Sequence, residues 1–245
     1  MLIKLENPAL LLKAVELVSE LVTEVRIRVN DYGLSMSAMD PANVAMVGFK
    51  LPKTIFSQFE VGNEVLGVNL DNLKRVLKRC GPGSSLTIKK EDNLLEMDIQ
   101  DRIKRVFSLR LIDIEGEEID FDAKSSRMTF PCVVQLNSVD LIDAIEDCSV
   151  VDDACSFIIK DGKFIIEAKG LNSSRAEFSG DEATIQGENC KSRYSLEYLS
   201  KFVKGAKLCE KTVIHFANDH PLKIDFIPSG MQLNFVLAPR VETED

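Results

Sequence analysis

The sequence predicts an α+β protein made of two similar domains, each with antiparallel sheets and two helices. Three observations support this prediction. Helical and strand-like segments recur in the same order in both halves of the 245-residue chain, an acid-rich segment lies at the midpoint, and alternating apolar strands outnumber the short helices. The order of helices and strands excludes an alternating, doubly wound α/β fold.

A helix is expected to open each half. Apolar residues recur at helical spacing in the first half at Leu11, Leu12, Val15, Val18 and Val22. At an offset of 130 they recur as Leu141, Ile142, Ile145 and Cys148. Each predicted helix runs into a strand-like segment, 25–29 or 155–159, and then into a turn that contains glycine. The repeat predicts the same supersecondary unit twice.

A second pair of helices is expected over residues 70–81 and 196–207, at an offset of 126. In the first of these, Asp71 is the expected N-cap and Gly81 the expected end. Both helices precede strands with alternating apolar residues. Each half therefore reads as strands interrupted by two helices.

The segment between the halves, 113–122, has six carboxylates in ten residues and no base. Charge repulsion favours an extended, solvated conformation. It is either a surface loop or an interdomain linker, and its midpoint position favours the linker. We expect an N-terminal domain over 1–112, a connector over 113–128 and a C-terminal domain over 129–245.

The bulk composition limits the class of protein. The sequence has 45% hydrophobic residues and a net charge of −9. The first residues do not form a signal peptide, and no uncharged apolar run approaches the length of a membrane span. We expect an intracellular protein that does not bind membranes. The six cysteines lack CxxC spacing, so we expect free thiols.

Residues for catalysis are few. The chain has two histidines and lacks a GxSxG elbow, a P-loop, an HExxH pair and a dinucleotide fingerprint. Zinc and iron sites normally draw three or four ligands from a rigid scaffold, whereas His215 falls in a strand-like segment and Asp219 and His220 in a turn, so no metal and no cofactor are expected. An α+β enzyme with an acidic site around Asp40 or the connector remains the alternative from another class.

The predicted helices differ in charge. The second carries four bases against Asp71, and the fourth carries three lysines against Glu197. The first is nearly balanced, whereas the third carries Asp140, Asp143, Glu146 and Asp147. Solvated helix faces explain such charges equally well. Two basic helices at equivalent positions of a duplication would, however, lie on one surface.

The sequence resembles proliferating cell nuclear antigen in its archaeal form over essentially its whole length, and five segments carry the resemblance. They are 37–47 (SAMDPANVAMV), 67–79 (GVNLDNLKRVLKR), 111–115 (LIDIE), 194–204 (YSLEYLSKFVK) and 237–242 (LAPRVE). The resemblance implies a DNA sliding clamp and polymerase processivity factor without catalysis. It implies a head-to-tail trimer, a ring of six domains whose helices line the hole around duplex DNA. It also implies a cytoplasmic, nucleoid-associated protein in an archaeal cell, or a nuclear one in a eukaryote.

By position, the resemblance assigns three groups of residues. The DNA-facing lining comprises Lys13, Arg75, Lys78, Arg79, Lys201, Lys204 and Lys207. The subunit joint pairs an edge strand carrying Phe107 and Leu109 with an edge strand of the next chain carrying Ala176 and Phe178. The pocket for client peptides comprises Met39, Asn43, Val44, Met46, Ile119, Phe121, Pro221, Val236, Ala238 and Pro239.

The implied partners are duplex DNA, bound without sequence preference, and a clamp loader. Replicative polymerase, flap endonuclease and DNA ligase would bind through short peptide motifs. The acidic third predicted helix departs from the family, which commonly has bases there. A heterotrimeric ring therefore stays open beside the homotrimer, which the commonness of homo-oligomers favours. A checkpoint-type clamp with other clients is a separate alternative, and the close match of 37–47 and 237–242 disfavours it.

Overall fold

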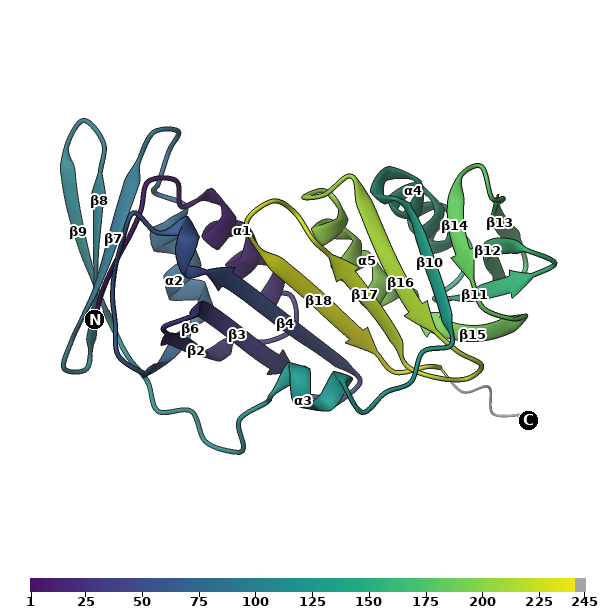
Figure 1. The fold of residues 1–245 in the computed structure, drawn as a ribbon, viewed down its shortest axis with the longest axis horizontal. Helices are drawn as coiled ribbons and strands as arrows, with labels where there is room; N and C mark the ends of the chain where they lie inside the picture. Colours follow the sequence, from purple (N-terminus) through teal and green to yellow (C-terminus); the bar gives the residue numbers. More distant parts are fainter. Residues whose placement is uncertain (241–245) are drawn as a thin grey trace. The chain divides into compact units, whose positions relative to one another are not determined.

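The computed structural model describes residues 1–240, so Val241 and Glu242 of the last family-like segment lie outside the described residues. The chain forms two compact units (Figure 1). The first comprises Met1–Pro41, Val47–Phe121 and Gly230–Gln232. The second comprises Ala42–Met46, Asp122–Ser229 and the described residues 233–240. Each unit combines antiparallel strands with helices, which confirms the predicted fold class.

The first unit contains helices α1 (Ala9–Val18) and α2 (Leu70–Leu77), together with a short 3-10 turn, η1 (Lys53–Ile55). One of its sheets has the order β5 (Gln58–Glu60), β1 (Leu2–Leu5), β7 (Ser85–Glu91), β8 (Leu94–Gln100) and β9 (Lys104–Arg110). A second run of paired strands has the order β4 (Ala45–Pro52), β3 (Gly33–Met39), β2 (Glu24–Asn30) and β6 (Glu64–Asn69).

The second unit repeats this plan with helices α4 (Ser138–Ser149) and α5 (Leu196–Ala206). One run of strands is β14 (Ala183–Gln186), β10 (Cys132–Asn137), β16 (Lys211–Phe216), β17 (Leu222–Phe226) and β18 (Gln232–Leu237). The other is β13 (Ser173–Phe178), β12 (Lys163–Lys169), β11 (Ala154–Lys160) and β15 (Cys190–Ser195). In this second sheet β13 is an edge strand, as β9 is in the first unit.

The predicted apolar positions form the cores of the two units. On α2 they are Leu70, Leu73, Val76 and Leu77, and all four are buried. Their counterparts on α5, which are also buried, are Leu196, Leu199, Phe202 and Val203. Burial of matching positions in both units confirms the duplication at the level of packing.

Two local predictions are wrong. The N-cap of α2 is Asn69, whose side chain accepts a hydrogen bond from the Asn72 amide at 3.0 Å. Asp71 lies instead in the first turn and pairs with Lys74 at 2.8 Å. Asn and Asp are similarly favourable caps, so the end of the preceding strand, rather than cap preference, decides at which residue the helix begins. The helix also ends at Leu77 rather than near Gly81.

The segment predicted to be extended, 113–122, contains no helix up to residue 120, but at its end a short helix begins, α3 (Phe121–Ser125). Figure 1 shows the connector as the teal segment that leaves β9 and reaches α3. Asp122 in the first turn and Lys124 in the last complement the helix dipole. The side chain of Phe121 is buried, with an exposed fraction of 4%. Burial of this apolar side chain opposes the charge repulsion on which the extended prediction rested.

Candidate functional sites

In each unit the two long helices pack against one another, α1 on α2 and α4 on α5. Their exposed faces carry bases that the family resemblance assigns to DNA. Arg75, Lys78, Arg79, Lys204 and Lys207 are exposed, and Lys13 is largely so. These six bases therefore lie on the outward faces of two equivalent helix pairs or just after the ends of α2 and α5, whereas Lys201 is partly buried.

In the first unit, one acidic residue lies between two of these bases. One carboxylate oxygen of Glu16, on α1, lies 3.1 Å from the ammonium of Lys13 on the same helix. The other lies 3.4 Å from the ammonium of Lys78, which directly follows α2. Partial burial raises the pKa of Glu16, but hydrogen bonds from the two lysines outweigh it and bring the pKa below its ordinary value. Arg75 and Arg79 add further positive charge on this side of the unit.

In the second unit the charges are separated by helix. Lys201 of α5 pairs with Glu197 at 3.0 Å, and its ammonium lies 5.1 Å from the centre of the Tyr198 ring. On α4, Asp143, Glu146 and Asp147 are exposed, and the helix contains no lysine or arginine. This pair therefore presents one basic and one acidic helix.

The strands assigned to the subunit joint are both edge strands. On β9, Phe107 and Leu109 are partly buried, and they alternate with exposed residues such as Val106. On β13, Ala176 is partly buried, whereas Phe178 is only 7% exposed and stacks on Phe164 at 5.9 Å. Phe178 therefore packs mainly within its own unit, and the strand offers its backbone edge and its polar residues.

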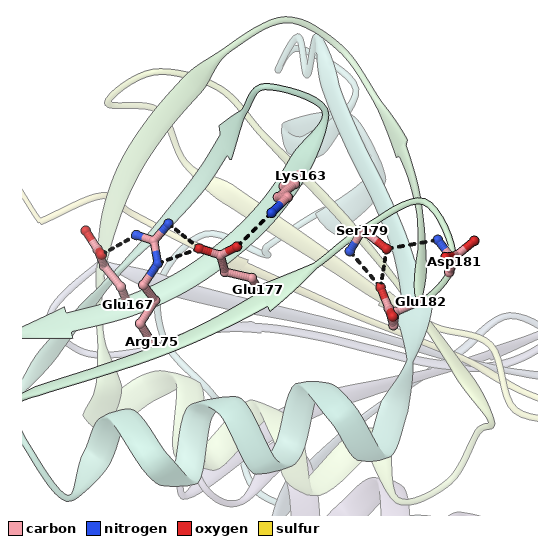
Figure 2. Close-up of polar contacts among 7 residues, drawn as sticks. All are labelled: Lys163, Glu167, Arg175, Glu177, Ser179, Asp181 and Glu182. Carbon is pink, nitrogen blue, oxygen red and sulfur yellow. Dashed lines mark hydrogen bonds and ion pairs between the residues drawn. The ribbon is translucent and has the colours of Figure 1, made fainter.

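The β13 edge carries an ordered set of polar contacts (Figure 2). Arg175 bridges Glu167 at 2.8 Å and Glu177 at 2.6 Å, and Lys163 also reaches Glu177 at 3.1 Å. Beyond the strand, Glu182 accepts hydrogen bonds from the amide and hydroxyl of Ser179. Hydrogen bonds from Arg175 and Lys163 lower the pKa of Glu177. These acids therefore stay ionised at neutral pH.

The residues assigned to the client pocket fall in both units. In the second unit, the Ala238 amide donates to the Val44 carbonyl at 2.8 Å, so the 42–46 loop and the end of β18 lie together. Asn43 is exposed with a left-handed φ of 59°, and Pro221 and Pro239 are partly exposed. Met46 and Val236 are only 3% and 5% exposed, so most of their surface packs within the protein.

The remaining pocket residues belong to the first unit. Met39 and Ile119 are partly exposed. Phe121 is buried on Gly48 of β4, where an added Cβ would lie 2.5 Å from the Phe121 ring. The ring of Phe121 therefore occupies the space that a side chain at position 48 would fill. The sequence analysis did not predict this role of Gly48. A glycine inside a strand pattern is the signal that would have indicated a close approach.

The structure gives further facts about the reactive side chains. All six cysteines are free thiols, and four of them are buried. His215 lies 2.9 Å from a carboxylate oxygen of Asp225. Within residues 1–240, no group of three or more His, Cys, Asp or Glu side chains is arranged to hold a metal ion. Nor does any helix in that range have the length and apolar character that crossing a membrane requires.

Comparisons with known proteins agree with this architecture. The family model described as proliferating cell nuclear antigen, N-terminal domain, matches residues 1–120, and the corresponding C-terminal model matches 125–241. The DNA polymerase sliding clamp of Thermococcus fumicolans is 38% identical over 232 residues, covering 91% of this chain and 92% of that one. The DNA polymerase sliding clamp of Pyrococcus furiosus is 37% identical over 237 residues, covering 93% of both.

Solved structures show the same fold. Proliferating cellular nuclear antigen from Entamoeba histolytica has a TM-score of 0.88 at 22% identity, covering 98% of both chains. A chain of the PCNA2–PCNA3 complex from Sulfolobus tokodaii has a TM-score of 0.86 at 24% identity, covering 99% of this chain and all of that one. The class is thus a two-domain clamp subunit. The chain belongs to the proliferating cell nuclear antigen family of DNA polymerase sliding clamps.

Proposed function

We propose that the chain acts as a ring-forming tether that encircles duplex DNA and holds replication enzymes on it without catalysing a reaction itself. The observation that carries this proposal is a basic helix at the same place in both units, α2 and α5. Bases on a smooth helical surface neutralise phosphates but do not read base edges. Such contacts let the protein slide, while ring closure prevents its escape.

The DNA-facing residues in this proposal are those already placed on the helix pairs. They are Lys13, Arg75, Lys78, Arg79, Lys201, Lys204 and Lys207. The rest of the acidic protein repels the duplex, and this repulsion directs DNA toward the basic faces. The net charge of −9 and DNA binding are therefore compatible.

For ring closure, the partner proposed for each edge is a second copy of this chain. The segment 102–110, which includes β9, has four bases and no acid. The segment 175–182, with β13 and the turn after it, has three acids against Arg175. Opposite charges on the two edges favour head-to-tail pairing of identical chains, and three copies give a ring of six domains. Pairing also covers both exposed edges.

The client pocket is proposed to lie along the connector and to accept short helical peptides with aromatic anchors. Each apolar anchor that is fully buried contributes about 1.5–3 kcal/mol before ordering costs. The expected clients are a replicative polymerase, flap endonuclease and DNA ligase, and an ATP-driven loader opens the ring. The proposed place of action is the nucleoid of an archaeal cell.

Two measurements on the purified chain test this function. Sedimentation equilibrium at micromolar concentration should give the mass of three chains. Clamps loaded on nicked circular duplex should resist salt that releases them from linear duplex, because retention on a circle is topological. If the measured mass is that of a monomer, the ring of identical chains is ruled out and only a ring of different chains remains. Equal salt sensitivity on circular and linear DNA would contradict encirclement altogether.

A further inference from the structure

The connector is attached to the first unit where it leaves β9. The Leu111 amide donates to the Asn93 carbonyl at 2.9 Å, and the Ile112 amide donates to the Gly67 carbonyl of β6 at the same distance. An added Cβ at Gly67 would lie 2.0 Å from the Ile112 carbonyl oxygen. Only glycine permits this approach, so the path of the connector over β6 is fixed by the sequence of the strand.

Two arginines of β2 hold the middle of the connector. Arg26 donates to the carbonyl of Ile114 and, at 2.9 Å, to that of Gly116. Arg28 donates through Nε and Nη2 to both carboxylate oxygens of Glu118, which is the bidentate geometry of a strong pair. Along β2 these arginines alternate with the core residues Val25, Ile27 and Val29, so the strand directs them outward.

The far end is held by Phe121, whose ring lies on Gly48. Ile119 lies between the residue held by Arg28 and this buried ring, and it stays partly exposed. The connector therefore has a backbone attachment at one end and an aromatic anchor at the other. Between them lies the bidentate pair of Arg28 and Glu118, called the arginine fork below. The acids of the connector have no base within 113–122, so Arg26 and Arg28 supply the opposite charge.

We propose that Arg26 and Arg28 are positioning residues for client binding: they order the connector before a client arrives, so that Ile119 is presented at a fixed place. This inference rests on the proposed client pocket. The physical reason is preorganisation, because a segment that is already ordered loses less conformational entropy when a peptide binds. The arginines themselves do not contact the client. Their replacement therefore acts through the connector.

The test combines NMR measurement of backbone order parameters along the connector with calorimetric titration of a client-type peptide. The probe peptide carries a glutamine, an aliphatic residue and two adjacent aromatics. Arg28→Ala should lower the backbone order parameters of residues 117–120 and weaken binding of the peptide about three- to tenfold, the range expected from ordering a few residues. The double variant Arg28→Glu with Glu118→Arg should restore most of the order of the connector and most of the affinity for the peptide, because it rebuilds the ion pair with its charges exchanged.

Matched controls separate this role from general destabilisation. Lys90→Ala removes another ion pair of the same unit, Lys90–Glu64 at 2.6 Å, and should change neither the order parameters of the connector nor the affinity for the peptide. Arg28→Lys keeps the charge but loses the fork and should give an intermediate result. The salt dependence of DNA binding should stay constant throughout, since Arg28 is not on the DNA-facing helices.

Each result decides between two failures. If the natural chain binds the peptide and Arg28→Ala binds it equally well, the positioning role is overturned and the pocket stands. If the order parameters at 117–120 do not fall in Arg28→Ala, the pair of Arg28 and Glu118 does not order the connector. If the natural chain does not bind the peptide at saturating concentration, the pocket itself is wrong and the inference fails with it.

Discussion

Helices α1 and α4 occupy equivalent places in the two units, yet their exposed faces differ in charge. On α1, Glu16 is matched by Lys13 and Lys78 within 3.4 Å. On α4, Asp143, Glu146 and Asp147 are exposed, and the helix has no base of its own. The buried faces remain alike, since Leu11 and Leu141 are both in the core. Packing preserves the buried pattern of a duplicated helix, whereas the charge of its outer face is free to diverge.

A second comparison concerns the chain that follows the last strand of each unit. After β9, the Ile112 amide binds the Gly67 carbonyl of β6 at 2.9 Å. After β18, the Arg240 amide binds the Arg193 carbonyl of β15 at 2.7 Å. Both units thus use the same edge to receive the outgoing chain. Only the first has the arginine fork, because the counterparts of Arg26 and Arg28 at the offset of 130 are Ser156 and Ile158.

The largest expected effect is on the free energy of unfolding, and it tests whether the cores of the two units are equivalent. Leu73→Ala on α2 and Leu199→Ala on α5 each remove an equivalent, buried side chain. Each should lower the free energy of unfolding by about 2–5 kcal/mol, measured by denaturant titration. Arg75→Ala, on the exposed face of α2, is the control and should change it little. A cost confined to one unit would show that the two cores are not equivalent.

The next effect tests the basic faces. Removing Lys78 and Arg79 should weaken binding to linear duplex more than removing Lys201 and Lys204, because α5 lies beside the acidic α4. The slope of log affinity against log salt should fall by about 0.9 for each phosphate contact that is lost. Fluorescence anisotropy across a salt series measures both quantities. Unchanged slopes after all four substitutions would remove these residues from the DNA-facing surface.

A smaller effect is expected at the acidic face. The pair Asp143→Asn and Asp147→Asn should strengthen binding to linear duplex at low salt by relieving repulsion from phosphates. The gain should vanish above roughly 0.1 M salt, where the screening length is about 10 Å. The matched pair Asp161→Asn and Glu188→Gln, at exposed loop positions of the same unit and away from the β13 edge, controls for net charge. Equal gains from both pairs would mean that α4 does not face DNA.

The smallest effect concerns the connector and pH. Hydrogen bonds from Arg28 are the main cause that lowers the pKa of Glu118 below its ordinary value of about 4.3. The fork therefore stabilises the folded connector fully above that value and ceases to do so as pH falls through the lowered pKa. Titration of the Glu118 carboxyl by NMR should show the depression, and Arg28→Ala should abolish it. A normal pKa in the natural chain would contradict the fork.

The sequence by itself determined the duplication, the fold class and the basic character of α2 and α5. These follow from local patterns: apolar periodicity sets the buried face of a helix, and the remaining positions carry its charge. The acidic segment also contains two apolar residues, Ile119 and Phe121, which the family resemblance assigns to the client pocket.

Only the tertiary structure decided how that segment is held. Arg26 and Gly67 lie far along the chain from Ile112 and Ile114, and no spacing rule connects them. Gly48 receives the Phe121 ring because β4 passes beneath it, and Asn69 replaces Asp71 as the cap because β6 ends there. Contacts between distant residues depend on where the strands bring them together, so a local pattern does not contain them.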